Sequence, residues 1–188
     1  HGIELSATRM ALWAQTRRLC RFIVVNRIDA DGVDLPARVD ELRAAFGQEC
    51  LPVNLPTAGA RGVVDCFFAP GGAPTDFGSV EAAHRALVEQ VVEVDDDLTE
   101  RYLSGAEIEA QALHDAFERA LREGHIVPIL FTSARTGAGI AELIDFVVRL
   151  APNPTEGKPP LFERWPSGDR ERAESFTATR PPSYHVLA

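Results

Sequence analysis

Two short polar motifs directly follow two short apolar runs of the chain. Residues 26–29 (Asn-Arg-Ile-Asp) follow the run 22–25, and residues 132–134 (Thr-Ser-Ala) follow the run 126–131. A strand that is apolar on both faces is typical of the interior of a parallel sheet, and ligands of open α/β sheets bind beyond the carboxyl ends of such strands. The two motifs therefore predict one shared ligand site, and their amide, carboxylate and hydroxyl groups favour a nucleotide base.

The pair of motifs resembles the base-recognition elements of guanine-nucleotide-binding proteins, which read Asn-Lys-x-Asp and Ser-Ala followed by Lys or Leu. The chemistry suits guanine. An ionised Asp has only acceptor oxygens, so one carboxylate can accept from the ring N–H and the exocyclic N–H₂ of guanine in a bidentate, charge-assisted contact. Adenine has no such pair of donors. Asp29 is therefore the residue expected to select guanine.

The resemblance implies a role for each residue of the motifs. Asp29 would read guanine, Asn26 would brace the loop and the base, and Ser133 would hold Asp29 in place. The backbone N–H of the residue after Ser133 would donate to the guanine oxygen. The expected guanine-binding residues are Asn26, Arg27, Asp29, Ser133, Ala134 and Arg135.

Arg27 departs from the Lys that is usual at this position. Its aliphatic stem would lie along the base, but a planar guanidinium is not an ammonium. Differences from the family are therefore expected in the ribose contacts and in the affinity. An isolated Asn-x-x-Asp after a strand also fits a turn or a helix N-cap, so the motif needs support from the rest of the chain.

That support comes from a resemblance of nearly the whole chain to bacterial translation elongation factor G and its close paralogues. The segments that match in order are residues 2–4 with 8–10 and 13, then 22–29, 51–56, 62–65, 94–105 and 127–134. The resemblance implies that the full-length parent is an enzyme, a GTP hydrolase. It would bind GTP or GDP with Mg²⁺ and promote ribosomal translocation, or a related step, in the cytoplasm.

The sequence has no phosphate-binding loop of the form Gly-x-x-x-x-Gly-Lys followed by Ser or Thr. Such a loop would hold phosphates with its N–H groups and its Lys. The family's Asp-x-Pro-Gly element and the His after it are also absent, and residues 137–139 (Gly-Ala-Gly) indicate only a turn before a helix. We therefore expect no catalytic residue and no metal ligand in this chain. We also expect that the chain alone does not hydrolyse GTP, and that the Mg²⁺ ligands belong to the parent.

The first and last residues suggest an internal piece of a longer protein. The chain begins with His1 rather than Met, and residues 181–188 resemble the start of the family's second, β-barrel domain. We therefore expect the C-terminal part of a GTPase domain followed by a linker. The alternative is a complete small protein with a processed N-terminus.

Composition excludes several other classes of protein. The net charge of −9 over 188 residues argues against free-standing nucleic-acid binding, because such domains are usually basic. Cys20, Cys50 and Cys66 have no CxxC or Cys/His spacing, which disfavours a disulfide framework or a zinc site. The apolar runs are much shorter than the roughly 20 residues that span a bilayer. No membrane partner is expected, and the cytoplasm is the expected location.

Apolar periodicity predicts alternating helices and strands. A helix is predicted over 5–18, with Leu5, Met10, Leu12 and Trp13 as its apolar positions. A strand at 21–25 follows. The next helix begins at Asp34, has Pro36 in its first turn and ends before Gly47. The last helix, 139–150, should bury an apolar stripe made of Ile140, Leu143, Ile144, Val147 and Val148.

The predicted fold class is α/β: a partial P-loop-GTPase-type parallel sheet with flanking helices plus an inserted α+β subdomain. The insert would contain a strand at 63–68 and helices near 79–93, 95–104 and 106–122, and elongation factor G carries an inserted subdomain at the equivalent point. The predicted division is 1–57 with 126–151 as the partial GTPase domain, 58–125 as the insert, 152–183 as a linker and 184–188 as the start of the next domain.

The proline-rich segment 152–183 predicts an irregular linker, with Phe162 and Trp165 holding it against the domain surface. His84 and His114 each lie alone on a predicted helix, which disfavours a metal site. The acidic run 93–97 lacks the Gly and terminal Glu of a calcium loop and suits a helix N-terminus.

Two functions from other classes stay open. In the first, the chain is a non-enzymatic ribosome-interaction module whose nucleotide site is vestigial and whose residues 58–125 bind the ribosomal stalk protein. In the second, it is an unrelated α/β domain that binds a small ligand, with Asn26 and Asp29 only capping a turn.

Overall fold

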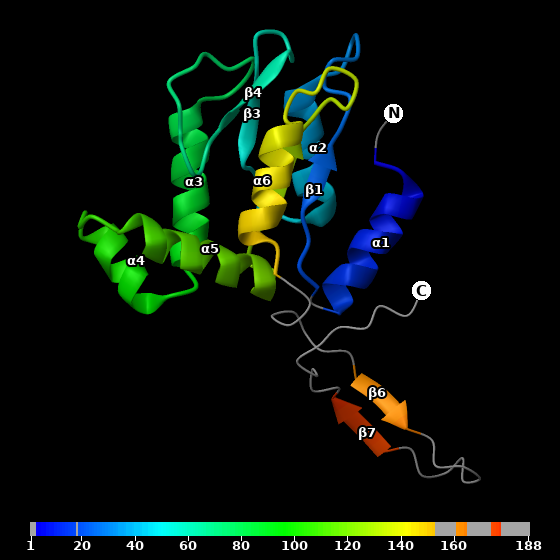
Figure 1. The fold of residues 1–188 in the computed structure, drawn as a ribbon, viewed down its shortest axis with the longest axis vertical. Helices are drawn as coiled ribbons and strands as arrows, with labels where there is room; N and C mark the ends of the chain where they lie inside the picture. Colours follow the sequence, from blue (N-terminus) through cyan, green and yellow to red (C-terminus); the bar gives the residue numbers. More distant parts are fainter. Residues whose placement is uncertain (1–2, 18, 153–160, 165–173, 178–188) are drawn as a thin grey trace. The chain divides into compact units, whose positions relative to one another are not determined.

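The computed structural model describes residues 3–17 and 19–152, together with the backbone of 161–164 and 174–177 (Figure 1). The chain divides into two compact units, residues 1–151 and 152–188.

A three-stranded parallel sheet forms the centre of the first unit, in the order β1-β5-β2. The strands are β1 (Ile23–Val25), β2 (Cys50–Pro52) and β5 (Val127–Phe131). Every residue of β5 is buried, as expected for the central strand of a parallel sheet covered on both faces. The predicted α/β class with a parallel sheet and flanking helices is confirmed, and a small antiparallel hairpin accompanies it.

Because β2 ends before β5 does, the side chain of Asn54 completes the pairing along this edge of β5. The N–H of Val53 donates to the carbonyl of Ile129 at 2.9 Å. Beyond it, the Asn54 amide donates to the Phe131 carbonyl at 3.2 Å and accepts from the Phe131 N–H at 2.7 Å. A buried backbone group must find a partner, and here one buried amide satisfies both groups of Phe131. The hydrogen bonding of β5 therefore stays regular through its last residue, Phe131.

The antiparallel hairpin consists of β3 (Asn54–Thr57) and β4 (Gly62–Asp65). The predicted strand 63–68 is wrong beyond Asp65. One carboxylate oxygen of Asp65 accepts from the backbone N–H groups of residues 67, 68 and 69, at 2.7, 2.6 and 3.1 Å. These bonds turn the chain away from the hairpin, since the N–H groups that a longer strand would need are already taken.

The next segment contains α3 (Val80–Val92), α4 (Asp96–Leu103) and α5 (Ala110–Glu123), close to the predicted helices. α4 and α5 lie near one end of α3 in Figure 1. The acidic run does form a helix N-terminus: Asp95 caps α4 and also pairs with Arg119 at 2.6 Å. Phe117 on α5 contacts Phe67 and Phe146, with ring centroids 4.4 and 6.3 Å apart. Residues 58–125 therefore share one core with the helix that follows β5.

α2 (Leu35–Phe46) begins and ends as its sequence predicts. The Asp34 side chain accepts from the N–H of Ala37 at 3.0 Å, Pro36 lies in the first turn, and Gly47 ends the helix with φ of 115°. These features confirm the predicted cap and helix end.

The predicted apolar face of α1 (Leu5–Thr16) is wrong. Its expected core residues are exposed, at 68% for Leu5, 65% for Met10, 50% for Leu12 and 49% for Trp13. At 100° per residue these positions span an arc of about 160°, wider than a narrow core-facing stripe. No residue of α1 is buried, and Met10 and Trp13 line an apolar groove together with Ala7, Ala11 and Ala14.

The predicted stripe of α6 (Ile140–Leu150) is also wrong in part. Phe146 and Leu150 are its buried residues, and Leu143 packs partly against the core. The predicted members Ile144, Val147 and Val148 are exposed. The spacing of 143, 146 and 150 places the largest side chains on one face, and this face contacts α5.

The second unit contains a two-stranded antiparallel sheet of β6 (Leu161–Arg164) and β7 (Glu174–Thr177). The prediction of irregular backbone throughout 152–183 is therefore wrong at these residues. Phe162 pairs with Phe176 in the register, and aromatic residues favour strands. Trp165 and residues 184–188 lie outside the described residues, as does any contact of Phe162 with the first unit.

Within the part of the chain that the structure describes, the helices are all too short or too polar to cross a membrane.

Candidate functional site

Parallel pairing brings the two polar motifs together. Val25, the last residue of β1, pairs with Phe131, the last residue of β5. The loops that follow stay joined, because the N–H of Thr132 donates to the Val25 carbonyl at 2.9 Å and the N–H of Ile28 donates to the Thr132 carbonyl at 3.2 Å. Both motifs thus emerge at one point on the carboxyl edge of the sheet.

Asn26 ties the first loop to the second. Its side-chain oxygen accepts from the backbone N–H of Ala134 at 3.0 Å and from the Thr132 hydroxyl at 3.4 Å. The Ala134 N–H, which was expected to meet a guanine oxygen, is therefore bonded to Asn26 in this structure.

Asp29 is the most heavily bonded side chain of the site. Its Oδ1 accepts from the Ser133 hydroxyl at 2.5 Å, and its Oδ2 accepts from the Arg135 Nε at 2.6 Å and also pairs with Arg135 Nη2. The expected contact between Ser133 and Asp29 is present. The Asp29 side chain is 11% exposed and that of Arg135 is 76% exposed. A mostly enclosed carboxylate is thus covered by an Arg that reaches it from solvent.

These contacts fix the charge of the site. The hydrogen bond from Ser133, followed by the one from Arg135, lowers the pKa of Asp29 below its ordinary value. The carboxylate is therefore ionised near neutral pH and acts only as an acceptor.

We expect an Asp29 pKa below the ordinary value of about 3.9, measured by following its carboxyl carbon with NMR during an acid titration. Because the pKa is lowered on folding, this carboxylate stabilises the fold above about pH 3.9, and that contribution disappears as pH falls through the lower native pKa. Ser133→Ala should raise the Asp29 pKa. An Asp29 pKa at or above the ordinary value in the wild-type chain would contradict the observed hydrogen bonding.

The backbone between Asn26 and Asp29 makes a tight turn. Arg27 has φ of 65°, which is uncommon for a residue other than Gly, and its carbonyl accepts from the N–H of Ala30 at 3.0 Å. Ile28 is 4% exposed and anchors the turn in the core. The side chain of Arg27 is exposed beside this turn.

The second loop is closed by its own backbone. The N–H of Ser133 donates to the Ala138 carbonyl and the N–H of Gly137 donates to the Ser133 carbonyl, both at 2.8 Å. Gly139 has φ of 71°, and a Cβ at this position would lie 2.2 Å from the carbonyl oxygen of Phe131. The loop therefore lies directly against the end of β5.

The structure thus joins Asn26, Asp29, Ser133, Ala134 and Arg135 in one bonded cluster, with Arg27 in the same turn. Sequence reasoning placed Thr132 in the second motif without a role, and it missed Gly139 as part of the site and the ion pair of Arg135. The glycines at 137 and 139 were the available signal for the tight loop, but only the fold shows what they approach.

Other reactive side chains have structural partners. His84 Nδ1 lies 2.8 Å from the Cys66 carbonyl oxygen, and His114 lies 3.8 Å from Glu118. Burial raises the pKa of Cys66 to about 12. Among the described residues, no group of His, Cys, Asp and Glu side chains is placed to bind a metal ion.

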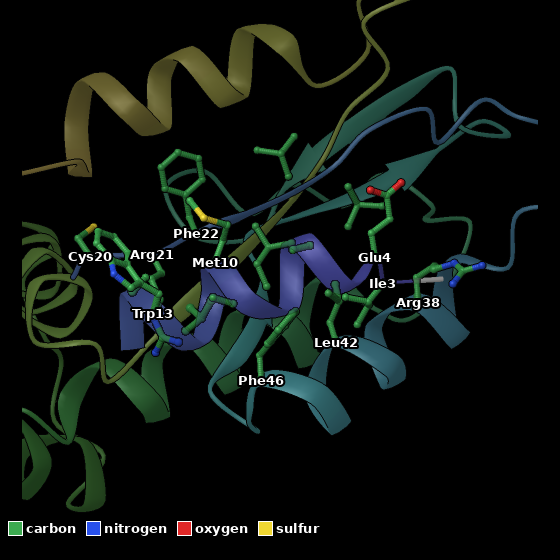
Figure 2. Close-up of a pocket in the computed structure, with 17 residues that line it drawn as sticks. Ile3, Glu4, Met10, Trp13, Cys20, Arg21, Phe22, Arg38, Leu42 and Phe46 are labelled. Carbon is green, nitrogen blue, oxygen red and sulfur yellow. The ribbon is translucent and has the colours of Figure 1, made fainter. Parts of the chain in front are cut away.

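A separate apolar groove of about 610 Å³ lies between α1, the segment leading into β1, and α2. Figure 2 shows Glu4 and Arg38 toward one end of this groove and Cys20 and Arg21 toward the other. Its lining includes Met10, Phe22 and Phe46, and it contains none of the bonded cluster around Asp29.

Comparison with known proteins gives distant relatives. No protein-family model matches the chain. Over 176 residues, 84% of this chain and 26% of the relative, it is 27% identical to elongation factor G of Fervidobacterium nodosum. A crystal structure of a Thermus thermophilus protein superposes with a TM-score of 0.70 at 29% identity, covering 85% of this chain and 27% of that one. The chain spans about a quarter of the length of each relative, and over most of its own length it is distantly similar to elongation factor G.

Proposed function

We propose that this chain is the guanine-recognising part of an elongation factor G-like translational GTPase. The observation that carries the proposal is the mostly enclosed carboxylate of Asp29, which accepts from Ser133 in a cluster that also contains the backbone N–H of Ala134. The distant similarity to elongation factor G over most of the chain supports it.

The hydrogen-bonding groups of Asp29 and Ala134 fit guanine. A carboxylate offers acceptors for the ring N–H and the exocyclic N–H₂, and a backbone N–H offers a donor for the ring oxygen. Adenine would instead place a ring nitrogen lone pair against the carboxylate, which leaves a charged acceptor without its donor and is unfavourable. When the base binds, the Ala134 N–H must replace its bond to Asn26 with one to the guanine oxygen. Asp29 must replace its bonds to Arg135 with bonds to the guanine donors.

The activity belongs to the parent protein in this proposal. Phosphoryl transfer from GTP needs a phosphate loop, Mg²⁺ and a residue that orients the attacking water, and the sequence of this chain has no phosphate loop. The chain would supply base selection, while the parent would bind GTP or GDP with Mg²⁺, hydrolyse GTP and act on the ribosome in the cytoplasm. Residues 58–125, as the inserted subdomain, would be the part that contacts the ribosomal stalk protein.

Titration of the ¹⁵N-labelled chain with GMP and AMP tests base selection directly. The two ligands carry the same phosphate, so a difference between them reports the base. We expect GMP to shift the amide signals of residues 26–30 and 132–136 and to bind about tenfold or more tightly than AMP, as the loss of one charge-assisted contact implies. IMP, which lacks the exocyclic amine, should bind less tightly than GMP. Equal affinity for GMP and AMP would contradict guanine recognition.

A further inference from the structure

Arg135 is the one charged residue of the bonded cluster that approaches Asp29 from solvent. Its Nε donates to Asp29 Oδ2 at 2.6 Å, and its Nη2 pairs with the same oxygen. Ser133 is fully buried and reaches the other oxygen from the protein side. The two donors therefore occupy opposite parts of the carboxylate.

We propose that Arg135 is an internal competitor of the base: it covers the acceptor edge of Asp29 in the free protein, and guanine binds only after the guanidinium leaves. This inference rests on the proposed guanine site. It changes the role of Arg135 from a contact of the base to a residue that sets the affinity of the site.

The exposure of the two side chains supports competition. With Arg135 paired to it, the Asp29 side chain is only 11% exposed, so little of its carboxylate is open to a ligand until the guanidinium leaves. The bond from Ser133 can persist when a base binds, because a carboxylate oxygen has more than one acceptor direction. The bonds from Arg135 cannot persist, because its Nε and Nη2 both bond to Oδ2 and so occupy the acceptor directions of that oxygen.

Release of Arg135 requires little rearrangement. The Arg135 side chain is 76% exposed, so it can rotate into water without opening the core, and contact with water on that side limits the strength of the pair. Apparent affinity falls in proportion to the fraction of protein whose site is free. Arg135 should therefore weaken base binding several-fold without abolishing it.

Salt gives this competition a distinctive signature. Added salt weakens the pair between Arg135 and Asp29, whereas guanosine carries no charge of its own to be screened. Raising the ionic strength should therefore strengthen guanosine binding by the wild-type chain. In most charge-dependent binding sites the effect of salt is the reverse.

The test is titration of guanosine into the 188-residue chain at low and high ionic strength, followed by NMR. Arg135→Ala and Arg135→Gln should bind guanosine about fivefold more tightly than wild type at low ionic strength. This difference in affinity should disappear at high ionic strength. Arg38→Ala is the matched control, because it removes an exposed ion pair with Glu41 away from the site. It should behave as wild type at both ionic strengths.

The Nε–H signal of Arg135 gives a second readout. It should move toward the position of a solvent-exposed Arg as guanosine saturates the wild-type chain. If Arg135→Ala binds guanosine equally or more weakly than wild type, or if the Nε–H signal is unchanged at saturation, competition is overturned while guanine recognition stands. If neither wild type nor either Arg135 variant binds guanosine, the proposed function fails and this inference fails with it.

Discussion

Asp29→Asn is expected to reduce GMP binding by about 100-fold or more, because both base donors lose a charged acceptor and hydrogen bonds to charged groups are worth about 1.5–3 kcal/mol each. The amide has nearly the shape of the carboxylate, and its oxygen can still accept from Ser133, whose hydroxyl lies 2.5 Å from Asp29 Oδ1. The fold should therefore survive. NMR titration with GMP measures the affinity, and the amide spectrum without ligand reports the fold.

The same substitution should change which base the site prefers. Xanthine carries an oxygen where guanine carries the exocyclic amine, and an Asn amide can donate to that oxygen. Asp29→Asn should therefore bind xanthosine monophosphate more tightly than GMP. Asp31→Asn, a neighbouring exposed carboxylate, is the control and should leave GMP binding unchanged. Undiminished GMP binding by Asp29→Asn would favour an unrelated small-ligand domain in which Asp29 only shapes a turn.

The parts of the fold that local chemistry determines could be predicted from sequence. The cap at Asp34 and the helix end at Gly47 depend on nearby backbone groups, and both are present. The meeting of the two polar motifs follows from parallel pairing of the strands before them. These features need no knowledge of how distant segments fit together.

The features that depend on distant neighbours could not be predicted. From sequence, Asn54 is indistinguishable from an ordinary strand residue, yet its side-chain amide hydrogen-bonds to the backbone of Phe131, 77 positions away. Val148 reads as a core residue of α6 but is 77% exposed, because the choice of buried face depends on which element covers the helix. Strand β4 ends early because the Asp65 side chain takes the next N–H groups, which a strand pattern does not reveal.

The same distinction applies to the site. A resemblance between motifs indicates which residues surround a base, and the contact expected between Ser133 and Asp29 is present. It does not indicate what those residues bond to without the base. The pairing of Arg135 with Asp29 became visible only when the two loops were placed together.

Gly139→Ala is expected to lower the free energy of unfolding by roughly 3 kcal/mol, far more than Gly137→Ala. Both glycines have positive φ, 71° and 85°, so each substitution carries a backbone strain of about 1–2 kcal/mol. They differ in their surroundings. A Cβ at Gly139 would lie 2.2 Å from the Phe131 carbonyl oxygen, whereas a Cβ at Gly137 would have nothing within 4 Å.

The Phe131 carbonyl cannot easily move to relieve the clash, because it accepts a hydrogen bond from the buried Asn54 side chain. The loop must move instead, and Ser133 lies in that loop. Gly139→Ala should therefore both destabilise the fold and raise the pKa of Asp29 by weakening its bond to Ser133, while Gly137→Ala should leave that pKa closer to the wild-type value. Urea unfolding and a carboxyl titration measure the two effects. Similar losses of stability in the two variants would mean that the loop can withdraw from β5 at little cost, and that close packing at Gly139 does not hold Ser133 beside Asp29.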